Sequence, residues 1–79
     1  MNSYFDAKRE LKKIYGLGLK AIKRNDAKYI NYLLFNLKQL EDSLSEKFDI
    51  DAFGTYALKK EIGRMRVFMA LKLKGKGSN

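Results

Sequence analysis

The strongest constraint on the fold of this chain is an apolar ladder in its middle. Its members are separated by alternating steps of three and four residues: Ile30, Leu33, Leu37, Leu40 and Leu44. This spacing places all five side chains along one side of an α-helix. The 79 residues include no proline, the residue that most often breaks a helix. We therefore predict an all-α fold with a helix over this segment.

The predicted middle helix carries more apolar surface than one partner would need. Ala27, Tyr32, Leu34 and Phe35 lie off the ladder and widen its apolar arc. Asn25 and Asp26, both favourable N-cap residues, precede it. We therefore predict a central helix that begins after Asp26 and touches two neighbours.

A first helix is predicted to begin at Ser3, with Asp6 favourably placed in its first turn. Its apolar positions repeat at helical spacing: Tyr4, Ala7, Leu11, Ile14 and Tyr15. Gly16 and Gly18 follow, and each costs a helix interior about 1 kcal/mol relative to alanine. Either the helix ends at these glycines, or its backbone must approach another part of the molecule closely.

A third helix is predicted to begin near Ala52, with Asp49 or Asp51 as its cap. Its ladder comprises Leu58, Ile62, Met65 and Met69, and Gly63 beside it would allow another backbone to pack closely. The predicted fold is an antiparallel helical hairpin with an additional N-terminal helix, a small three-helix domain that could dimerise into a bundle. The helical domain covers residues 1–74, and residues 75–79 form a flexible basic tail.

The composition argues against an enzyme. The chain has no histidine and no cysteine, so it lacks the commonest general base, the commonest metal ligand and any thiolate. The acidic residues between Glu41 and Asp51 lack the spacing of a calcium loop. We predict no catalytic residue, no bound metal, no cofactor and no small-molecule substrate.

Membrane insertion and secretion are also not expected. The longest uncharged run, Tyr29 to Leu37, is far shorter than the roughly 20 residues that cross a bilayer. The first residues lack the basic and apolar regions of a secretory signal. We expect an intracellular, cytoplasmic protein without integral membrane association.

The charges are arranged in blocks. Residues 1–40 carry nine Lys and Arg against three acids, residues 41–51 one Lys against five acids, and residues 52–79 seven Lys and Arg against one acid. These differences of +6, −4 and +6 sum to the net charge of +8. If the acidic block forms a turn, one end of the molecule is negative and the remainder attracts a polyanion.

The basic side chains of the first and third helices form stripes at helical spacing. A solvated face is the simplest interpretation, but few acids lie between them, and we therefore predict contacts to nucleic-acid phosphates. With one addition from the middle helix, the candidate residues are Lys8, Lys12, Lys13, Lys20, Lys23, Arg24, Lys38, Lys59, Lys60, Arg64, Arg66, Lys72 and Lys74.

The surplus apolar residues leave alternatives open. Val67, Phe68 and Leu71 lie off the third ladder, and they pack against the first helix or form an oligomer interface. The second interpretation makes the protein a homodimeric helical adaptor or regulator. Tyr29, Tyr32 and Phe35 are either core residues or stacking partners for bases. Binding to an anionic membrane would need one clean apolar face, whereas the end of the third helix is mixed.

Two segments resemble a known family. Phe35-Asn36-Leu37-Lys38 and the run Leu58 to Arg66 are similar to the two signatures of the ribosomal protein L-twenty-nine family. The resemblance covers about residues 27–74 and implies an antiparallel two-helix hairpin that binds large-subunit ribosomal RNA. By the same resemblance, the RNA contacts are Lys38, Lys59, Lys60, Arg64 and Arg66. This is the only ground for preferring RNA over DNA.

Overall fold

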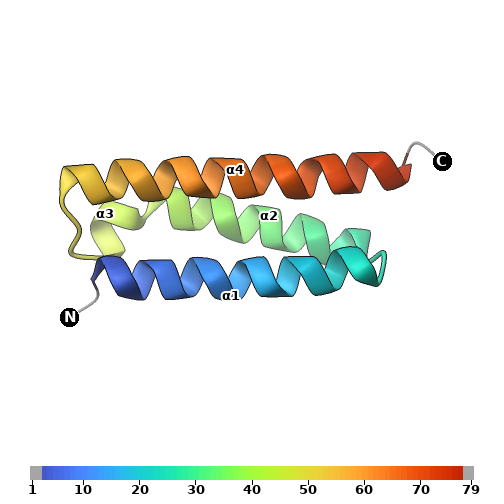
Figure 1. Ribbon diagram of the computed structural model, residues 1–79, viewed down its shortest axis with the longest axis horizontal. Helices are drawn as coiled ribbons and strands as arrows, with labels where there is room; N and C mark the ends of the chain where they lie inside the picture. The colour runs from blue at the N-terminus through green and yellow to red at the C-terminus, as the bar shows by residue number, and fades with distance from the viewer. Residues whose placement is uncertain (1–2, 78–79) are drawn as a thin grey trace.

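Three long helices and one short helix make up the computed structural model, which describes residues 3–77 and the side chains of residues 3–74. The helices are α1 (Tyr4–Lys23), α2 (Ala27–Asp42), α3 (Leu44–Lys47) and α4 (Ala52–Gly77). Helices α1 and α4 run in the same direction and α2 runs in the opposite one, in an elongated bundle of 43 × 17 × 14 Å (Figure 1). The predicted all-α, three-helix fold is confirmed.

Side-chain caps fix the start of each long helix. The backbone N–H of Ser3 donates to the Asp6 carboxylate at 2.9 Å, and this bond holds the pKa of Asp6 below its ordinary value. Asp26 accepts from the backbone N–H of Tyr29 at 3.1 Å. Asp51, rather than Asp49, accepts from the backbone N–H of Gly54 at 2.7 Å. All three predicted starts are therefore confirmed.

The connection from α1 to α2 is a tight reversal. Asn25 has a positive φ of 59°, a conformation that asparagine tolerates better than most residues. The backbone N–H of Asn25 donates to the carbonyl of Ile22, and that of Asp26 donates to the carbonyl of Ala21. This is the Schellman pattern of a helix C-terminus. It reverses the chain within a few residues and sets α2 antiparallel to α1.

The predicted ladders meet in one core. All members of the middle ladder are buried, as are most of those predicted for the first and third helices. Each long helix contacts both of the others, so α2 touches two neighbours as predicted, and α1 and α4 do so as well. The N-terminal helix therefore docks on the hairpin. The buried apolar residues are Ala7, Leu11, Ile14, Ala21, Ile30, Leu33, Leu37, Leu40, Leu44, Phe48, Leu58, Ile62 and Met69.

Helix α1 passes through both of its glycines without ending. Gly18 is buried, and a Cβ there would overlap the terminal methyl of Met69 and lie 3.3 Å from its sulfur. A Cβ at Gly16 would meet nothing within 4 Å. Of the two alternatives, close approach is the correct one, and it applies to Gly18. Gly63 allows no such approach within this chain, because its Cβ would also meet nothing.

Two helix boundaries differ from the predicted ones. Helix α2 ends at Asp42, where the Ser43 hydroxyl donates to the carbonyl of Gln39 at 2.8 Å, and the short α3 follows. Leu44, the last member of the middle ladder, is buried from α3. Helix α4 continues to Gly77, into the predicted tail, because Leu73 still packs against the core. Residues 78 and 79 of that tail lie outside the described part of the chain.

Candidate nucleic-acid interface

The ends of three helices bring basic side chains together. Because α1 and α4 are parallel, their C-terminal turns lie at the same end of the bundle, where α2 begins (Figure 1). Among the residues with described side chains, those turns supply six cations. We call this group the basic end: Lys20, Lys23, Arg24, Lys28, Lys72 and Lys74.

The positive charge of the basic end exceeds what its helix termini require. Each helix C-terminus carries about half a negative charge, and a helix N-terminus carries about half a positive one. Two C-termini and one N-terminus therefore amount to roughly −0.5. Against this stand six cations and, among the described residues of these turns, a single acid, Asp26. Most of the charge remains uncompensated by the fold.

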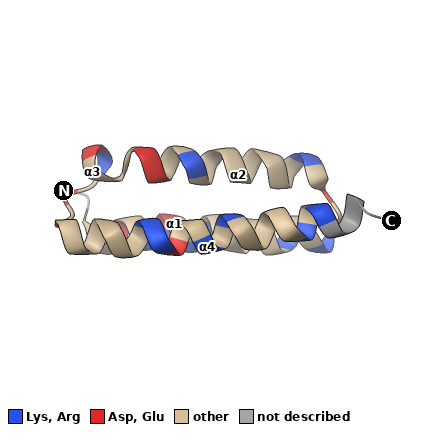
Figure 2. Ribbon diagram, turned by 90° about the horizontal axis from the view of Figure 1, so that it is seen from above, with Lys and Arg blue, Asp and Glu red and all other residues tan. Residues whose placement is uncertain are grey.

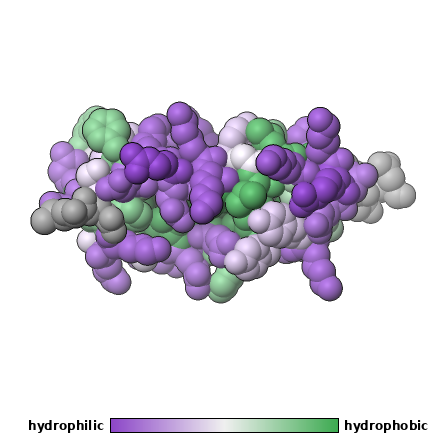
Figure 3. All heavy atoms as spheres, turned by 90° about the horizontal axis from the view of Figure 1, so that it is seen from below, coloured by the Kyte–Doolittle hydropathy of each residue, from purple (hydrophilic) through white to green (hydrophobic). Residues whose placement is uncertain are grey.

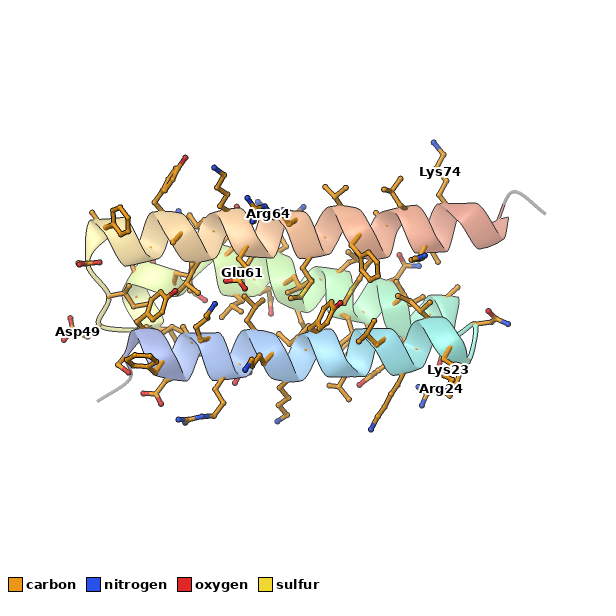
Figure 4. The ribbon with its side chains drawn as sticks, in the orientation of Figure 1. Lys23, Arg24, Asp49, Glu61, Arg64 and Lys74 are labelled. Carbon is orange, nitrogen blue, oxygen red and sulfur yellow. The ribbon has the colours of Figure 1, made fainter. Side chains whose placement is uncertain are left out.

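Most cations of the basic end have no anionic partner. Among the described residues, Lys20, Lys23, Lys28 and Lys74 are exposed and make no ion pair. Arg24 lies 3.8 Å from Asp26 and above the ring of Tyr29, and Lys72 lies above the ring of Phe68. Lys74 points outward from α4, whereas Lys23 and Arg24 lie on the α1 side (Figure 4). The cations therefore surround the end of the bundle.

The opposite end of the bundle is acidic. It contains the beginnings of α1 and α4 and the whole of α3, and its acids include Asp6, Glu46, Asp49 and Asp51. Figure 2 shows acidic residues at α3 and the adjoining part of α2, with Lys and Arg where α1 and α4 end. The charge blocks of the sequence have thus become a separation of charge along the long axis.

Outside the basic end, three of the predicted phosphate contacts are held in ion pairs. Lys8 Nζ lies 3.1 Å from Glu61, a hydrogen bond that links α1 to α4 and raises the pKa of Lys8. Arg66 Nη1 lies 2.9 Å from Glu41 and links α4 to α2. Lys38 Nζ lies 3.4 Å from Asp42, one turn along α2. The first two pairs join helices, and all three cations are less available to a ligand than those of the basic end.

The remaining predicted cations are exposed on the outer sides of α1 and α4. Lys12 and Lys13 belong to α1, and Lys59, Lys60 and Arg64 belong to α4. Lys60 Nζ lies 5.8 Å from the centre of the Tyr56 ring. The structure therefore divides the predicted cations among three groups: the basic end, the outer faces of α1 and α4, and the ion pairs.

Lys28 was absent from the predicted phosphate contacts. It lies in the first turn of α2, where acids are favoured by the helix dipole, yet that turn contains none. The sequence signal that could have identified Lys28 as a phosphate contact was a lysine in a first helical turn where an acid would be favoured. Its position beside the ends of α1 and α4 depends on the tertiary arrangement.

The aromatic residues of α2 correct one prediction. Tyr32 and Phe35 are exposed, so the core interpretation is wrong for both, because they lie on the side of α2 away from α1 and α4. Tyr29 is half-buried and stacks on Tyr32, with ring centroids 5.8 Å apart. A stacked pair of rings, of which Tyr32 is the exposed one, thus follows Lys28 at the start of α2.

The three residues predicted to form an oligomer interface lie in two different environments. Phe68 packs against Tyr15 of α1, with ring centroids 6.2 Å apart, and is half-buried. Val67 and Leu71 are exposed on the outer side of α4. The two alternatives for this cluster therefore separate: Phe68 packs against the first helix, and only Val67 and Leu71 remain available to a partner.

A hollow of about 680 Å³ lies between α1 and α2. Its lining includes Glu10, Lys13, Asn36 and Gln39, so both signs of charge are present. Such a lining attracts anions much less than the basic end does.

Comparisons with family models, with curated proteins and with solved structures found no match. Among the described residues, every helix is too short or too polar to cross a bilayer.

Proposed function

We propose that this protein is a non-enzymatic nucleic-acid-binding protein that contacts the phosphate backbone through its basic end. The observation that carries the proposal is the convergence there, among the residues with described side chains, of six cations from α1, α2 and α4 with a single acid. A field of this kind concentrates a polyanion at one end of the molecule while the acidic end repels it.

The proposed contacts are to phosphates rather than to bases. Lys20, Lys23 and Lys74 are flexible point charges at the ends of helices, and such side chains position a nucleic acid without reading its sequence. Tyr32 offers exposed ring surface near Lys28, on which an unpaired base could stack. We therefore expect weak sequence preference and a strong dependence on salt.

A slight preference for RNA remains part of the proposal through the family resemblance alone. Of the residues matched by that resemblance, Lys59, Lys60 and Arg64 are exposed, whereas Lys38 and Arg66 are in ion pairs. The helices that carry the two signatures, α2 and α4, lie antiparallel to each other. The ratio of RNA to DNA affinity is therefore the informative quantity.

Two triple variants locate the binding surface. Lys20, Lys23 and Lys74 are changed to Gln in one, and Lys12, Lys13 and Lys59 in the other, so that each loses three exposed lysines. Binding to a labelled RNA hairpin is measured by fluorescence anisotropy over a series of salt concentrations. Each phosphate contact contributes about 0.7 to 0.9 to the slope of log affinity against log salt. The first variant should lose about 2 to 3 from the slope, and the second much less.

Equal losses of slope and affinity in the two variants would show that net charge, and not the basic end, determines binding. Circular dichroism provides the control for folding, because all six lysines are exposed and neither variant should lose helicity.

A further inference from the structure

Helix α4 presents an apolar and basic strip on the side turned away from the core. Its members follow one another at steps of three or four residues, so they share one side of the helix, and all are exposed. Lys74 points away from α1 on this side (Figure 4). We call this set the α4 strip: Phe53, Tyr56, Lys60, Arg64, Val67, Leu71 and Lys74.

The apolar members of the strip are large and open to solvent. The exposed fractions are 81% for Phe53, 65% for Tyr56, 59% for Val67 and 62% for Leu71. The core is filled from the other side of α4, by Leu58, Ile62 and Met69. Single exposed apolar residues are ordinary, but four along one helix face indicate an interaction surface.

The charge of the strip selects its partner. Three of its seven members are cations and none is an acid. A second copy of the chain would place Lys60 and Arg64 of each copy near the middle of a shared interface, where like charges repel. An anionic partner meets no such repulsion. Asp49 lies at the acidic end of the bundle (Figure 4), beyond the strip.

The apolar side chains then distinguish between anionic partners. Phosphate contact alone makes no use of Val67 and Leu71, whereas a lipid surface accepts both apolar side chains and cations. The strip spans 22 residues of one uninterrupted helix, or about 32 Å at 1.5 Å per residue step, which suits a broad surface. The long side chains of Lys60 and Lys74 can extend sideways to lipid phosphates while neighbouring apolar groups insert.

From these observations we infer that the α4 strip lies on the surface of an anionic lipid bilayer. The mixed sequence of this helix argued against a clean apolar face. In the folded chain, α1 and α2 cover the other sides of α4, and the exposed strip contains both components of surface binding. The protein would lie on the membrane without crossing it. Of the residues in this strip, only Lys74 also belongs to the basic end.

The test is co-sedimentation of the full chain with vesicles of equal parts phosphatidylglycerol and phosphatidylcholine, compared with pure phosphatidylcholine. We expect binding to the first and little to the second. A variant with Lys60, Arg64 and Lys74 changed to Gln should bind about 100-fold more weakly, at roughly fivefold per cation. Its matched control changes Lys12, Lys13 and Lys59 to Gln and removes the same charge from outside both the α4 strip and the basic end. The control should weaken binding far less.

The apolar contribution has its own pair of variants. Val67→Ser with Leu71→Ser should weaken vesicle binding about 10-fold, whereas Leu19→Ser on α1 should leave it nearly unchanged. The first pair should also leave RNA binding unchanged, which separates this inference from the proposed function.

Three outcomes would overturn the inference. One is the absence of binding to anionic vesicles. Another is loss of RNA binding in the Val67 and Leu71 double variant with vesicle binding retained, which would assign the strip to nucleic acid. The last is a solution mass of twice 9.2 kDa that this double variant halves, without vesicle binding, which would assign the strip to a second copy.

Discussion

The outer faces of α1 and α4 both carry several exposed cations, but they differ in the residues that lie between those cations. On α1, Arg9, Lys12, Lys20 and Lys23 follow one another. The exposed large apolar residues of this face are Phe5 at its start and Leu19, which is 43% exposed. The α4 strip has four large exposed apolar residues beside its three cations. Figure 3 looks at the α1 side, where hydrophilic side chains cover most of the surface around smaller hydrophobic patches.

This comparison indicates that basic charge alone is not sufficient to identify a binding surface. Apart from Lys20 and Lys23, which belong to the basic end, the outer face of α1 has the composition of an ordinary solvated helix face. The basic end differs from it by the convergence of three helices, and the α4 strip differs by its exposed apolar groups. Each proposal therefore depends on a second feature that accompanies the charge.

The largest expected effect separates the two sides of α4. Met69 is fully buried and Leu71 is largely exposed. Met69→Ala should lower the free energy of unfolding by about 2 to 5 kcal/mol, through lost burial and a cavity. Leu71→Ala should change it by about 0.5 kcal/mol or less. Urea unfolding measures both, and a loss above about 2 kcal/mol for Leu71→Ala would make the strip part of the fold rather than a free surface.

Glycine substitutions sharpen the comparison of α1 with α4. Gly16→Ala and Gly63→Ala should each stabilise the protein by about 0.5 to 1 kcal/mol, because each glycine is helical and a Cβ there meets nothing within 4 Å. Gly18→Ala should lack this gain, because the new Cβ would overlap the Met69 side chain. Thermal unfolding gives the order of the three. Equal stabilisation at Gly18 would contradict the close approach of α1 to α4.

The smallest expected effect concerns the ion pair that joins α1 to α4. The Lys8 and Glu61 side chains are 39% and 41% exposed, so solvent screens them and their coupling should be below about 1 kcal/mol. A double-mutant cycle with Lys8→Met and Glu61→Gln measures it. The folded pKa of Lys8 is raised, so the stabilisation is complete below the unfolded pKa of about 10.4 and is lost as pH rises through the folded pKa. Coupling that strengthens above that pH would contradict the assignment.

Local sequence signals predicted most of the fold. The ladder from Ile30 to Leu44 and the caps Asp26 and Asp51 depend on residues within a few turns of one another, and all of these appear in the structure. The break at Ser43 that produces α3 was not predicted, because the apolar spacing continues across it to Leu44. The spacing of apolar residues alone therefore does not reveal a short break in a helix.

The surfaces were less predictable than the core. Phe68 and Leu71 are both apolar and lie less than one turn apart, yet one packs against Tyr15 and the other is exposed. Which of them faces α1 depends on how α4 is rotated in the bundle. The basic end likewise depends on the parallel alignment of α1 and α4, which brings Lys23 and Lys74 to the same end although 51 positions separate them.

The central claim is that the basic end binds nucleic-acid phosphates. The most direct test titrates nuclease-treated protein into a labelled RNA hairpin and a matched DNA duplex at about 50 and 200 mM salt. We predict binding at the lower salt that weakens about a hundredfold or more at the higher salt, as expected for several phosphate contacts. Absence of binding to both probes at low salt, or binding that is insensitive to salt, would contradict the claim.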